Sequence, residues 1–283
     1  MPKAFIRWTL YLAAVLAVGP FVGALTAWLR APDGGSDATP LVSTSPALGL
    51  AAAIAAVLAA LIVGMIGARL VGAKPGMSAA GLVLAWAAWR TGTIDQIIRG
   101  NGSGDVLWSL VGEGAIFGAA GVGLAYVLAA LARVEVDDKE RHLVVEPRPM
   151  SLGASAGPVI AGVIAGGAAA WLIAQTPLKG QTFAAAVVGA MFAAAAGRLI
   201  DMRAGLATLA IPVALLAILG PLSGIVMGAS PNMLVAGRNG ALFPLANILP
   251  LDWIAGGLLG IPLGIGWAAS LVEKRVEEKP AAR

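Results

Sequence analysis

The feature that most constrains this chain is a series of eight long apolar runs with almost no charge inside them. The hydrophobic fraction is 59% and the charged fraction is 12%, about half the charge of an ordinary soluble domain. Such runs cross the roughly 30 Å hydrocarbon core of a bilayer as helices, because a helix satisfies its own backbone amides. We therefore predict an all-α membrane protein of about eight transmembrane helices, over residues 5–28, 47–71, 77–92, 107–132, 153–175, 182–200, 205–228 and 251–273.

Two of these runs need a separate argument. The first follows Lys3 and Arg7, as the core of a secretory signal peptide would, but it is longer than such a core. We therefore expect it to be a helix of the mature protein. The run over 77–92 is the weakest of the eight, because it is short and ends at Arg90.

The lysines and arginines are distributed unevenly between the two sets of connections. With the N-terminus inside, 14 of the 19 fall in inner segments, and the outer segments hold only Arg30, Arg90, Arg99, Lys179 and Arg238. An excess of Lys and Arg marks the cytoplasmic loops of membrane proteins. We predict that both termini are cytoplasmic, in the inner cell membrane. The net charge of +4 is then attributed to this bias and not to nucleic-acid binding.

Three sets of matching positions indicate a tandem repeat of a four-helix unit. The matches are Arg69, Lys74 and Gly76 with Arg198, Arg203 and Gly205; Trp108, Gly112, Ile116 and Gly121 with Trp253, Gly257, Ile261 and Gly266; and Ala-Trp-Leu at 27–29 with 170–172. An even number of helices per unit gives both units the same orientation, so we predict a parallel 4+4 repeat. The predicted divisions are a first repeat over 1–134, a cytoplasmic linker over 135–150, a second repeat over 151–273 and a charged cytoplasmic tail over 274–283.

The composition also excludes several kinds of site. The chain has no cysteine and one histidine, His142. Disulfides, thiolate zinc sites and iron–sulfur clusters are therefore excluded, and the chain cannot supply the paired histidines of a b-type haem. We predict no cofactor and no metal. The predicted partner is the lipid bilayer, with a second copy of the chain or the other subunits of a membrane complex as open alternatives.

Small and aromatic residues predict how the helices pack. Glycines recur four positions apart, as at Gly114 and Gly118 or Gly256 and Gly260, and such stripes let helix backbones approach closely in lipid. Tryptophans near the ends of the runs are expected to lie at the membrane–water interfaces. These are Trp8, Trp28, Trp108, Trp171 and Trp253.

Glu113 is the one carboxylate that falls well inside a predicted helix, near its outer end. Ionisable groups inside a membrane cost free energy, and they are candidates for function by default. Three interpretations stay open. Glu113 couples transport to a proton or cation, or it forms a structural ion pair with Arg90, Arg99 or Arg238, or it reaches outward to water.

Two outer connections, 90–105 and 229–252, follow the third helix of each predicted repeat. Each combines a short apolar stretch with a Gly/Asn turn, and the second is apolar enough to re-enter the bilayer. A substrate or ion pathway would then lie near these segments and Glu113, which adds Asn239 and Asp252 to the candidates. At the inner face, Arg69, Arg198 and Arg203 are expected to bind lipid headgroups or another anion, with Asp201 as an alternative partner for an arginine there.

Three functions from different classes are consistent with this sequence. A small-solute or ion transport protein is favoured by the repeat and by Glu113. A non-catalytic membrane subunit or scaffold is favoured by the small-residue helix faces and by the lack of any catalytic constellation. A membrane-embedded lipid-modifying enzyme would draw its acids and bases from Asp95, Asp105, Glu113 and Asp252.

Overall fold

The computed structural model describes residues 3–101, 105–132, 152–227, 235–237, 239 and 241–277. Within them the chain is helical and has no strand, which confirms the predicted all-α class. The long helices are α1 (Lys3–Ala13), continued through the π-helical turn η1 (Ala14–Val18) into α2 (Gly19–Thr26), then α3 (Pro46–Val71), α4 (Ala73–Arg90), α6 (Val106–Leu131), α7 (Leu152–Ile173), α8 (Lys179–Ile200), α9 (Leu206–Met227) and α11 (Pro250–Glu277). Two short elements, α5 (Ile94–Asn101) and the 3-10 turn η2 (Pro244–Asn247), lie between them. The predicted linker over 135–150 falls outside the described residues.

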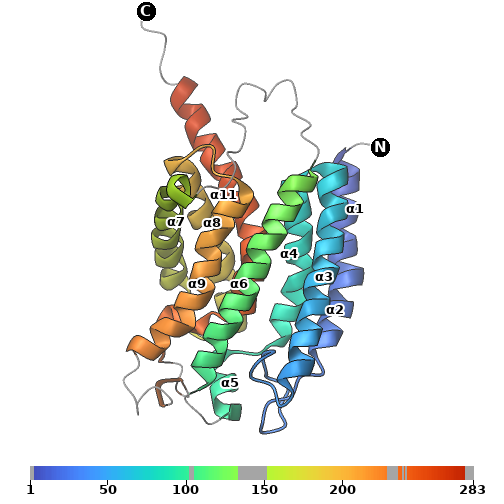
Figure 1. The fold of residues 1–283 in the computed structure, drawn as a ribbon, viewed down its shortest axis with the longest axis vertical. Coiled ribbons are helices and arrows are strands. Elements are labelled where there is room, and N and C mark those ends of the chain that lie inside the picture. Colours follow the sequence, from blue (N-terminus) through green and yellow to red (C-terminus); the bar gives the residue numbers. More distant parts are fainter. Residues whose placement is uncertain are drawn as a thin grey trace, which may run out of the picture.

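The long helices run alongside one another as one bundle (Figure 1). α1 begins and α11 ends at the same end of this bundle, while α5 and the connection over 27–45 lie at the opposite end, which we call the loop end. α6 packs mainly against α9, and α11 packs mainly against α8 and α4. The last helix of each predicted repeat therefore contacts the third helix of the other.

Seven of the described helices are long and apolar enough to cross a membrane: the continuous α1–α2 segment, α3, α6, α7, α8, α9 and α11. These helices support the predicted multi-pass membrane protein. The count is one lower than the predicted eight, and the helix that fails the criterion is α4, which holds the weak run over 77–92. Lys74 near its start and Arg90 at its end lower its apolar character.

α4 is nevertheless an interior element of the bundle. Met77, Val83, Leu84 and Ala87 have no exposed surface, and α4 contacts α2, α3 and α11. The turn into it is made at Gly72, whose φ of 107° is disfavoured for residues with a side chain. Because other helices and not lipid surround much of α4, it reaches its place in the bundle with less apolar character than its neighbours.

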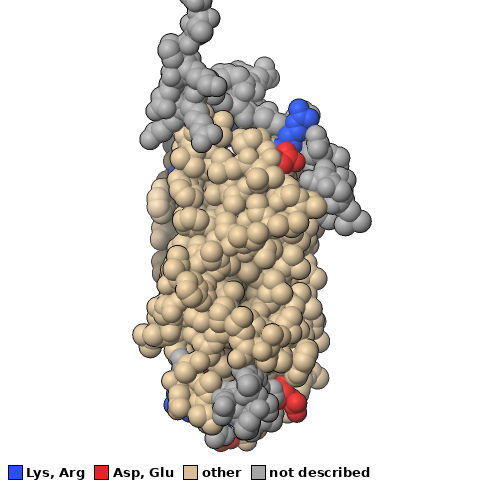
Figure 2. All heavy atoms as spheres, turned by 90° about the vertical axis from the view of Figure 1, so that its left-hand side faces the viewer, with Lys and Arg blue, Asp and Glu red and all other residues tan. Residues whose placement is uncertain are grey.

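The helices place small residues inside and large apolar residues outside. Along α3 a row of large side chains four positions apart is about half exposed: Ile54, Leu58, Ile62 and Ile66. Positions on the other face of α3 are small and buried: Ala53, Ala56, Ala60 and Gly64. A protein in water would bury its large apolar side chains. In lipid such side chains can face outward without cost, while small residues inside let the helices pack closely. Figure 2 shows the resulting surface on one side of the molecule, with an uncharged band between two ends that carry the charges.

The predicted close packing at glycines is confirmed. A Cβ on Gly260 of α11 would lie 2.2 Å from the carbonyl oxygen of Val187 on α8, and a Cβ on Gly264 would lie 2.1 Å from that of Met191. Likewise, a Cβ on Gly114 of α6 would lie 2.3 Å from the Ala217 carbonyl oxygen on α9. All three contacts require residues without side chains, so the glycine stripes favour the pairing of α11 with α8 and of α6 with α9.

The five tryptophans predicted to lie at the membrane–water interfaces have two kinds of environment. Trp8, Trp28, Trp108 and Trp171 are exposed, as interfacial residues should be. For Trp253 the prediction was wrong, because this side chain has no exposed surface and lies in the core of the bundle. Gly189 and Gly220 border its indole ring and leave the space that it fills.

Candidate functional site

Two carboxylates are buried in the helices near the loop end. Glu113 of α6 is 1% exposed and Asp252 of α11 is 0% exposed. A buried charge is costly unless it is paired or hydrogen-bonded. The partners of these two groups therefore indicate what this end of the bundle is built to do.

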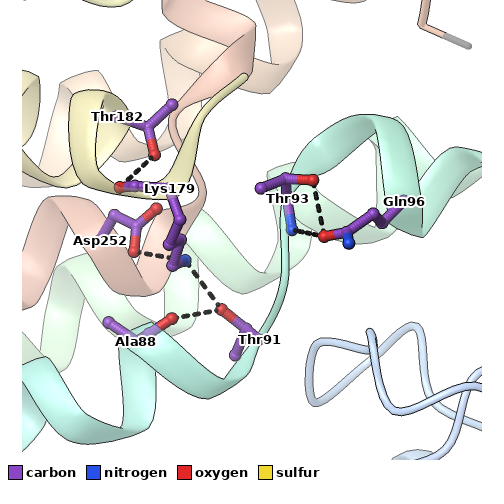
Figure 3. Close-up of polar contacts among 7 residues, drawn as sticks. All are labelled: Ala88, Thr91, Thr93, Gln96, Lys179, Thr182 and Asp252. Atoms are coloured by element: carbon purple, nitrogen blue, oxygen red, sulfur yellow. Dashed lines mark hydrogen bonds and ion pairs between the residues drawn. The ribbon is translucent and has the colours of Figure 1, made fainter.

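Asp252 lies in the first turn of α11, where the helix dipole favours a negative charge. The ammonium group of Lys179, at the first residue of α8, lies 2.8 Å from Asp252 Oδ1, and only 12% of the Lys179 side chain is exposed. The same ammonium group donates to the Thr91 hydroxyl at 3.3 Å. Figure 3 shows the Lys179, Asp252 and Thr91 side chains pointing toward one another from α8, α11 and the end of α4. The pair itself lies within the second half of the chain, and the hydrogen bond to Thr91 links it to the first half.

This cluster is only partly saturated with hydrogen bonds. The Thr91 hydroxyl donates to the Ala88 carbonyl at 2.8 Å, and the Thr182 hydroxyl, beside Asp252, donates to the Lys179 carbonyl at 3.1 Å. Among the described residues, no hydrogen bond is made by three buried side-chain atoms of α11 and η2: Asp252 Oδ2, Trp253 Nε1 and Asn247 Oδ1. Buried polar atoms without a partner are rare in folded proteins, and each calls for an explanation.

Glu113 is bound by neutral donors. Its Oε1 accepts hydrogen bonds from the Thr39 hydroxyl at 2.6 Å and from the Leu41 backbone amide at 2.6 Å, while its Oε2 makes no hydrogen bond within the described residues. Thr39 and Leu41 belong to the connection over 27–45, which we call the α2–α3 loop. Glu113 thus holds this loop against α6.

The α2–α3 loop makes close contacts with three helices. A Cβ on Gly49, near the start of α3, would lie 2.2 Å from the Pro40 carbonyl oxygen. The Leu41 side chain lies beside Gly112 of α6, and the Asn101 side-chain amide of α5 donates to the Val42 carbonyl at 3.3 Å. The loop is therefore packed between α3, α5 and α6.

The structure does not bring Glu113 together with the predicted arginines that it describes. Arg90 is exposed at the end of α4, and Arg99 pairs with Asp95 one turn away on α5. Asn239 is also exposed, and Arg238 lies outside the described residues. Of the candidate residues at this end, Glu113 and Asp252 are buried, and the cation paired with Asp252 is Lys179.

At the other end of the bundle, the predicted arginines have separate environments. Arg69, in the last turn of α3, and Arg203 are exposed. Arg198 is half-buried and donates to the Ala204 carbonyl at 2.7 Å, with Asp201 as its charged neighbour. Arg198 therefore closes the turn between α8 and α9, while Arg69 and Arg203 present their charges to the surroundings.

The centre of the bundle between the two halves is apolar. A cavity of about 10 Å³ lies there, lined by Met77, Gly118, Gly121, Ala210, Val213, Ile254, Gly257, Leu258 and Ile261. This volume is at the lower limit for one water molecule, and the lining offers no polar side chain to hold it. The described residues also contain no group of three or more His, Cys, Asp or Glu side chains placed to bind a metal.

Sequence reasoning missed the partners of both carboxylates. Thr39 lies 74 positions from Glu113 along the chain, and no periodic pattern connects them. Lys179 could have been identified from the sequence, since it is the one lysine in the predicted outer segments and comes directly before an apolar run. A lone lysine there is a candidate partner for a carboxylate that begins another helix.

The comparisons with known proteins do not assign this site. No protein-family model, curated protein or solved structure matches this chain.

Proposed function

We propose that the chain is an eight-span inner-membrane protein built from two parallel four-helix repeats, with both termini in the cytoplasm. The contacts of α6 with α9 and of α11 with α4 support the repeat, because a two-fold axis along the membrane normal would relate such a pair of contacts. The start of α1 and the end of α11 at one end of the bundle agree with an even number of spans. α4 is the eighth span, shielded from lipid by its neighbours.

The function that the geometry supports best is transport of a small solute or an ion. The observation that carries this proposal is the Lys179–Asp252 pair, buried near the loop end and linked through Thr91 to the first half of the chain. Charged groups in membrane helices are costly, and they commonly mark substrate or ion pathways. Glu113 adds a second buried carboxylate at the same end. These groups would form the site at the outer entrance, and the structure corresponds to a closed state with an apolar centre.

In the proposed mechanism the two halves rotate relative to each other as rigid bodies, about the contacts of α6 with α11. The cavity in the apolar centre holds about 10 Å³, so passage of a solute there would require the helices around it to separate. The Thr91–Lys179 contact lies between α4 and α8 and would change in that motion. Alternating access of this kind is usual for transporters built from repeats.

The proposal is tested by flux into proteoliposomes made with the purified chain. The probes are Na⁺, K⁺, protons and a panel of small organic solutes, compared among the wild type, Glu113→Gln, Asp252→Asn and empty liposomes. We expect flux of at least one probe above the empty liposomes, reduced by Asp252→Asn. Asp95→Asn, which alters an ion pair on the short helix α5, is the matched control and should transport as the wild type does. Equal fluxes in all samples, including the empty liposomes, would exclude the proposal that the chain transports these probes.

The second candidate is a non-catalytic membrane subunit. The observation that favours it is the closely packed apolar interior, which would serve a scaffold without any moving part. A scaffold needs its buried ion pair only for stability. Under this alternative, Asp252→Asn lowers stability while the wild type transports no probe.

A further inference from the structure

The α2–α3 loop, which lies at the loop end beside α5, has the construction of a lid (Figure 1). We propose that this loop lifts from α6 as one body and gives water and solutes access to Glu113 from the loop end. The role of the lid as the outer gate rests on the proposed transport function. The inference starts from Glu113 Oε2, a buried carboxylate oxygen that makes no hydrogen bond within the described chain.

The α2–α3 loop holds its own shape. Its two ends are joined by a hydrogen bond from the Thr44 amide to the Arg30 carbonyl at 2.8 Å, and the Ala31 amide donates to the Gly35 carbonyl at 2.9 Å. Compact loops of about 6–16 residues with adjoining ends and packed side chains often carry function. Because of these internal contacts, the loop can move without unfolding. Its own apolar cluster is separate from the core of the bundle and consists of Leu29, Ala31 and Ala38.

The surface under the loop includes glycines of four neighbouring segments. A glycine has no side chain that interlocks with the loop, so the loop can separate from it without a change of side-chain rotamer. The loop residues Pro40, Asp37, Ala31 and Leu41 lie nearest to the Cβ positions of Gly49 on α3, Gly92 before α5, Gly100 on α5 and Gly112 on α6, respectively.

Opposing contributions act on the closed state of the loop. The hydrogen bonds from Thr39 and Leu41 to Glu113 Oε1 stabilise it, as does Val42, which belongs to the apolar cluster of the α5 isoleucines. Glu113 Oε2 destabilises it, because a buried polar atom without a partner costs free energy. Water would bond to Oε2 once the loop lifts, so opening recovers that cost. The loop is therefore closed at rest and can still open.

The first test is hydrogen exchange of the full chain in nanodiscs, measured for single amides. The Leu41 amide loses its bond to Glu113 when the loop lifts, whereas the Ala31 and Thr44 amides stay bonded inside the loop. Thr39→Val removes one bond to Glu113, so we expect about 5- to 30-fold faster exchange at Leu41, with Ala31 and Thr44 unchanged. Thr44→Val alters an exposed side chain and should leave Leu41 at the wild-type rate.

The second test locks the loop with a disulfide in a chain that has no cysteine of its own. A Cβ on Gly100 would lie 3.2 Å from Ala31 Cβ, close to the separation of about 3.5–4.5 Å in a disulfide. In the oxidised Ala31→Cys/Gly100→Cys protein we expect loss of the exchange at Leu41 that depends on opening, and loss of flux. Reduction with dithiothreitol should restore both.

A second cysteine pair at the same end of the bundle is the matched control. A Cβ on Gly224 of α9 would lie 3.0 Å from Ala246 Cβ of η2, and a disulfide there leaves the α2–α3 loop free. The Gly224→Cys/Ala246→Cys protein should therefore show the same exchange at Leu41 and the same flux in its oxidised and reduced forms.

Three outcomes would overturn the proposal. The first is equal exchange at Leu41 in the oxidised and reduced forms of the Ala31→Cys/Gly100→Cys protein. The second is an equal acceleration of Leu41, Ala31 and Thr44 in Thr39→Val, which would mean that the loop unfolds instead of lifting. The third is undiminished flux through the oxidised protein. If no sample transports any probe, the proposed function fails, and the exchange measurements alone decide whether the loop opens.

Discussion

α6 and α11 end the two halves of the chain, and each carries one buried carboxylate near the loop end. Asp252 of α11 has a cation, Lys179, as its partner. Glu113 of α6 has a hydroxyl and a backbone amide from the α2–α3 loop. In the proposed repeat the position that corresponds to Glu113 is Leu258, which is buried. The two halves therefore use a buried acid for different purposes, one to join helices and the other to hold a loop.

α6 and α11 also differ in how closely each packs against another helix of its own half. α11 lies against α8 along Gly256, Gly260 and Gly264, so that the two backbones touch. The pair that corresponds to it in the proposed repeat, α3 and α6, makes far less contact, and the α2–α3 loop packs against both helices at the loop end. The comparison shows that a loop with one buried hydrogen-bonding anchor can replace a glycine-mediated helix contact.

The largest effect is expected for Lys179→Met, which breaks the ion pair of α11. Removing one partner leaves Asp252 as an uncompensated buried charge, which should lower the free energy of unfolding by about 3–5 kcal/mol. The measurement is unfolding in mixed detergent–SDS micelles. Lys179→Arg, which retains the charge, should be clearly more stable than Lys179→Met. Equal stability of the two variants would show that the charge on residue 179 is unimportant.

The next effect concerns the glycine contact of α11. Gly260→Ala places a methyl group 2.2 Å from the Val187 carbonyl oxygen, so α8 and α11 must move apart. Overpacking of this kind should cost about 1–3 kcal/mol in the same unfolding assay. Gly266→Ala is the control on the same helix, because a Cβ there meets nothing within 4 Å. It should stabilise the protein slightly, by up to about 1 kcal/mol, since alanine favours the helix.

A smaller effect is expected where Glu113 holds the α2–α3 loop. Thr39→Val removes the hydroxyl that donates to Glu113 and should cost about 1–2 kcal/mol. The freed loop should also be cut faster in limited proteolysis, with the new cleavage sites within residues 27–45. Thr44→Val changes an exposed threonine of the same loop and should leave the cleavage rate unchanged. If both variants are cut at the wild-type rate, Glu113 does not anchor the loop.

The smallest effect is expected for the exposed ion pair of α5. Where they pair, Arg99 is 58% exposed and Asp95 is 13% exposed, so solvent screens the interaction from the arginine side. Asp95 also accepts a hydrogen bond from the Thr93 hydroxyl, which an asparagine oxygen can still accept. Asp95→Asn should therefore change the free energy of unfolding by no more than about 0.5 kcal/mol. Measured beside Lys179→Met, this variant compares a charge left exposed, on Arg99, with one left fully buried, on Asp252. A cost as large as that of Lys179→Met would mean that α5 is held far more tightly than its exposure indicates.

Much of the fold was predictable because long apolar runs have one stable arrangement in lipid, the helix. The close helix contacts at the glycine stripes were also predictable, because a spacing of four residues within one helix, as at Gly256 and Gly260, is visible in the sequence. The status of α4 was harder to predict, because its surroundings compensate for its weak apolar character and those surroundings are set by distant segments. Burial of Trp253 depends in the same way on Gly189 and Gly220, which lie on other helices.

The candidate site was predictable only in its carboxylates. Glu113 stands out because it interrupts an apolar run, and Asp252 because it begins one. Their partners come from distant parts of the chain, and charge alone suggested the arginines. The Asp95–Arg99 pair could have been predicted, since a spacing of four residues places both side chains on one helix face. That local pairing would have removed Arg99 from the candidate partners of Glu113.

The interior position of α4 has a consequence for how the chain enters the membrane. With Lys74 and Arg90 near its ends and modest apolar character between them, α4 alone would partition weakly from the translocon into lipid. α3 is strongly apolar, and the backbones of the two helices touch where Gly67 meets Gly76. We therefore expect α3 and α4 to insert together as a hairpin turned at Gly72. Biogenesis would then be most sensitive to bulky substitutions at these three glycines, even though none of them lies near the buried carboxylates.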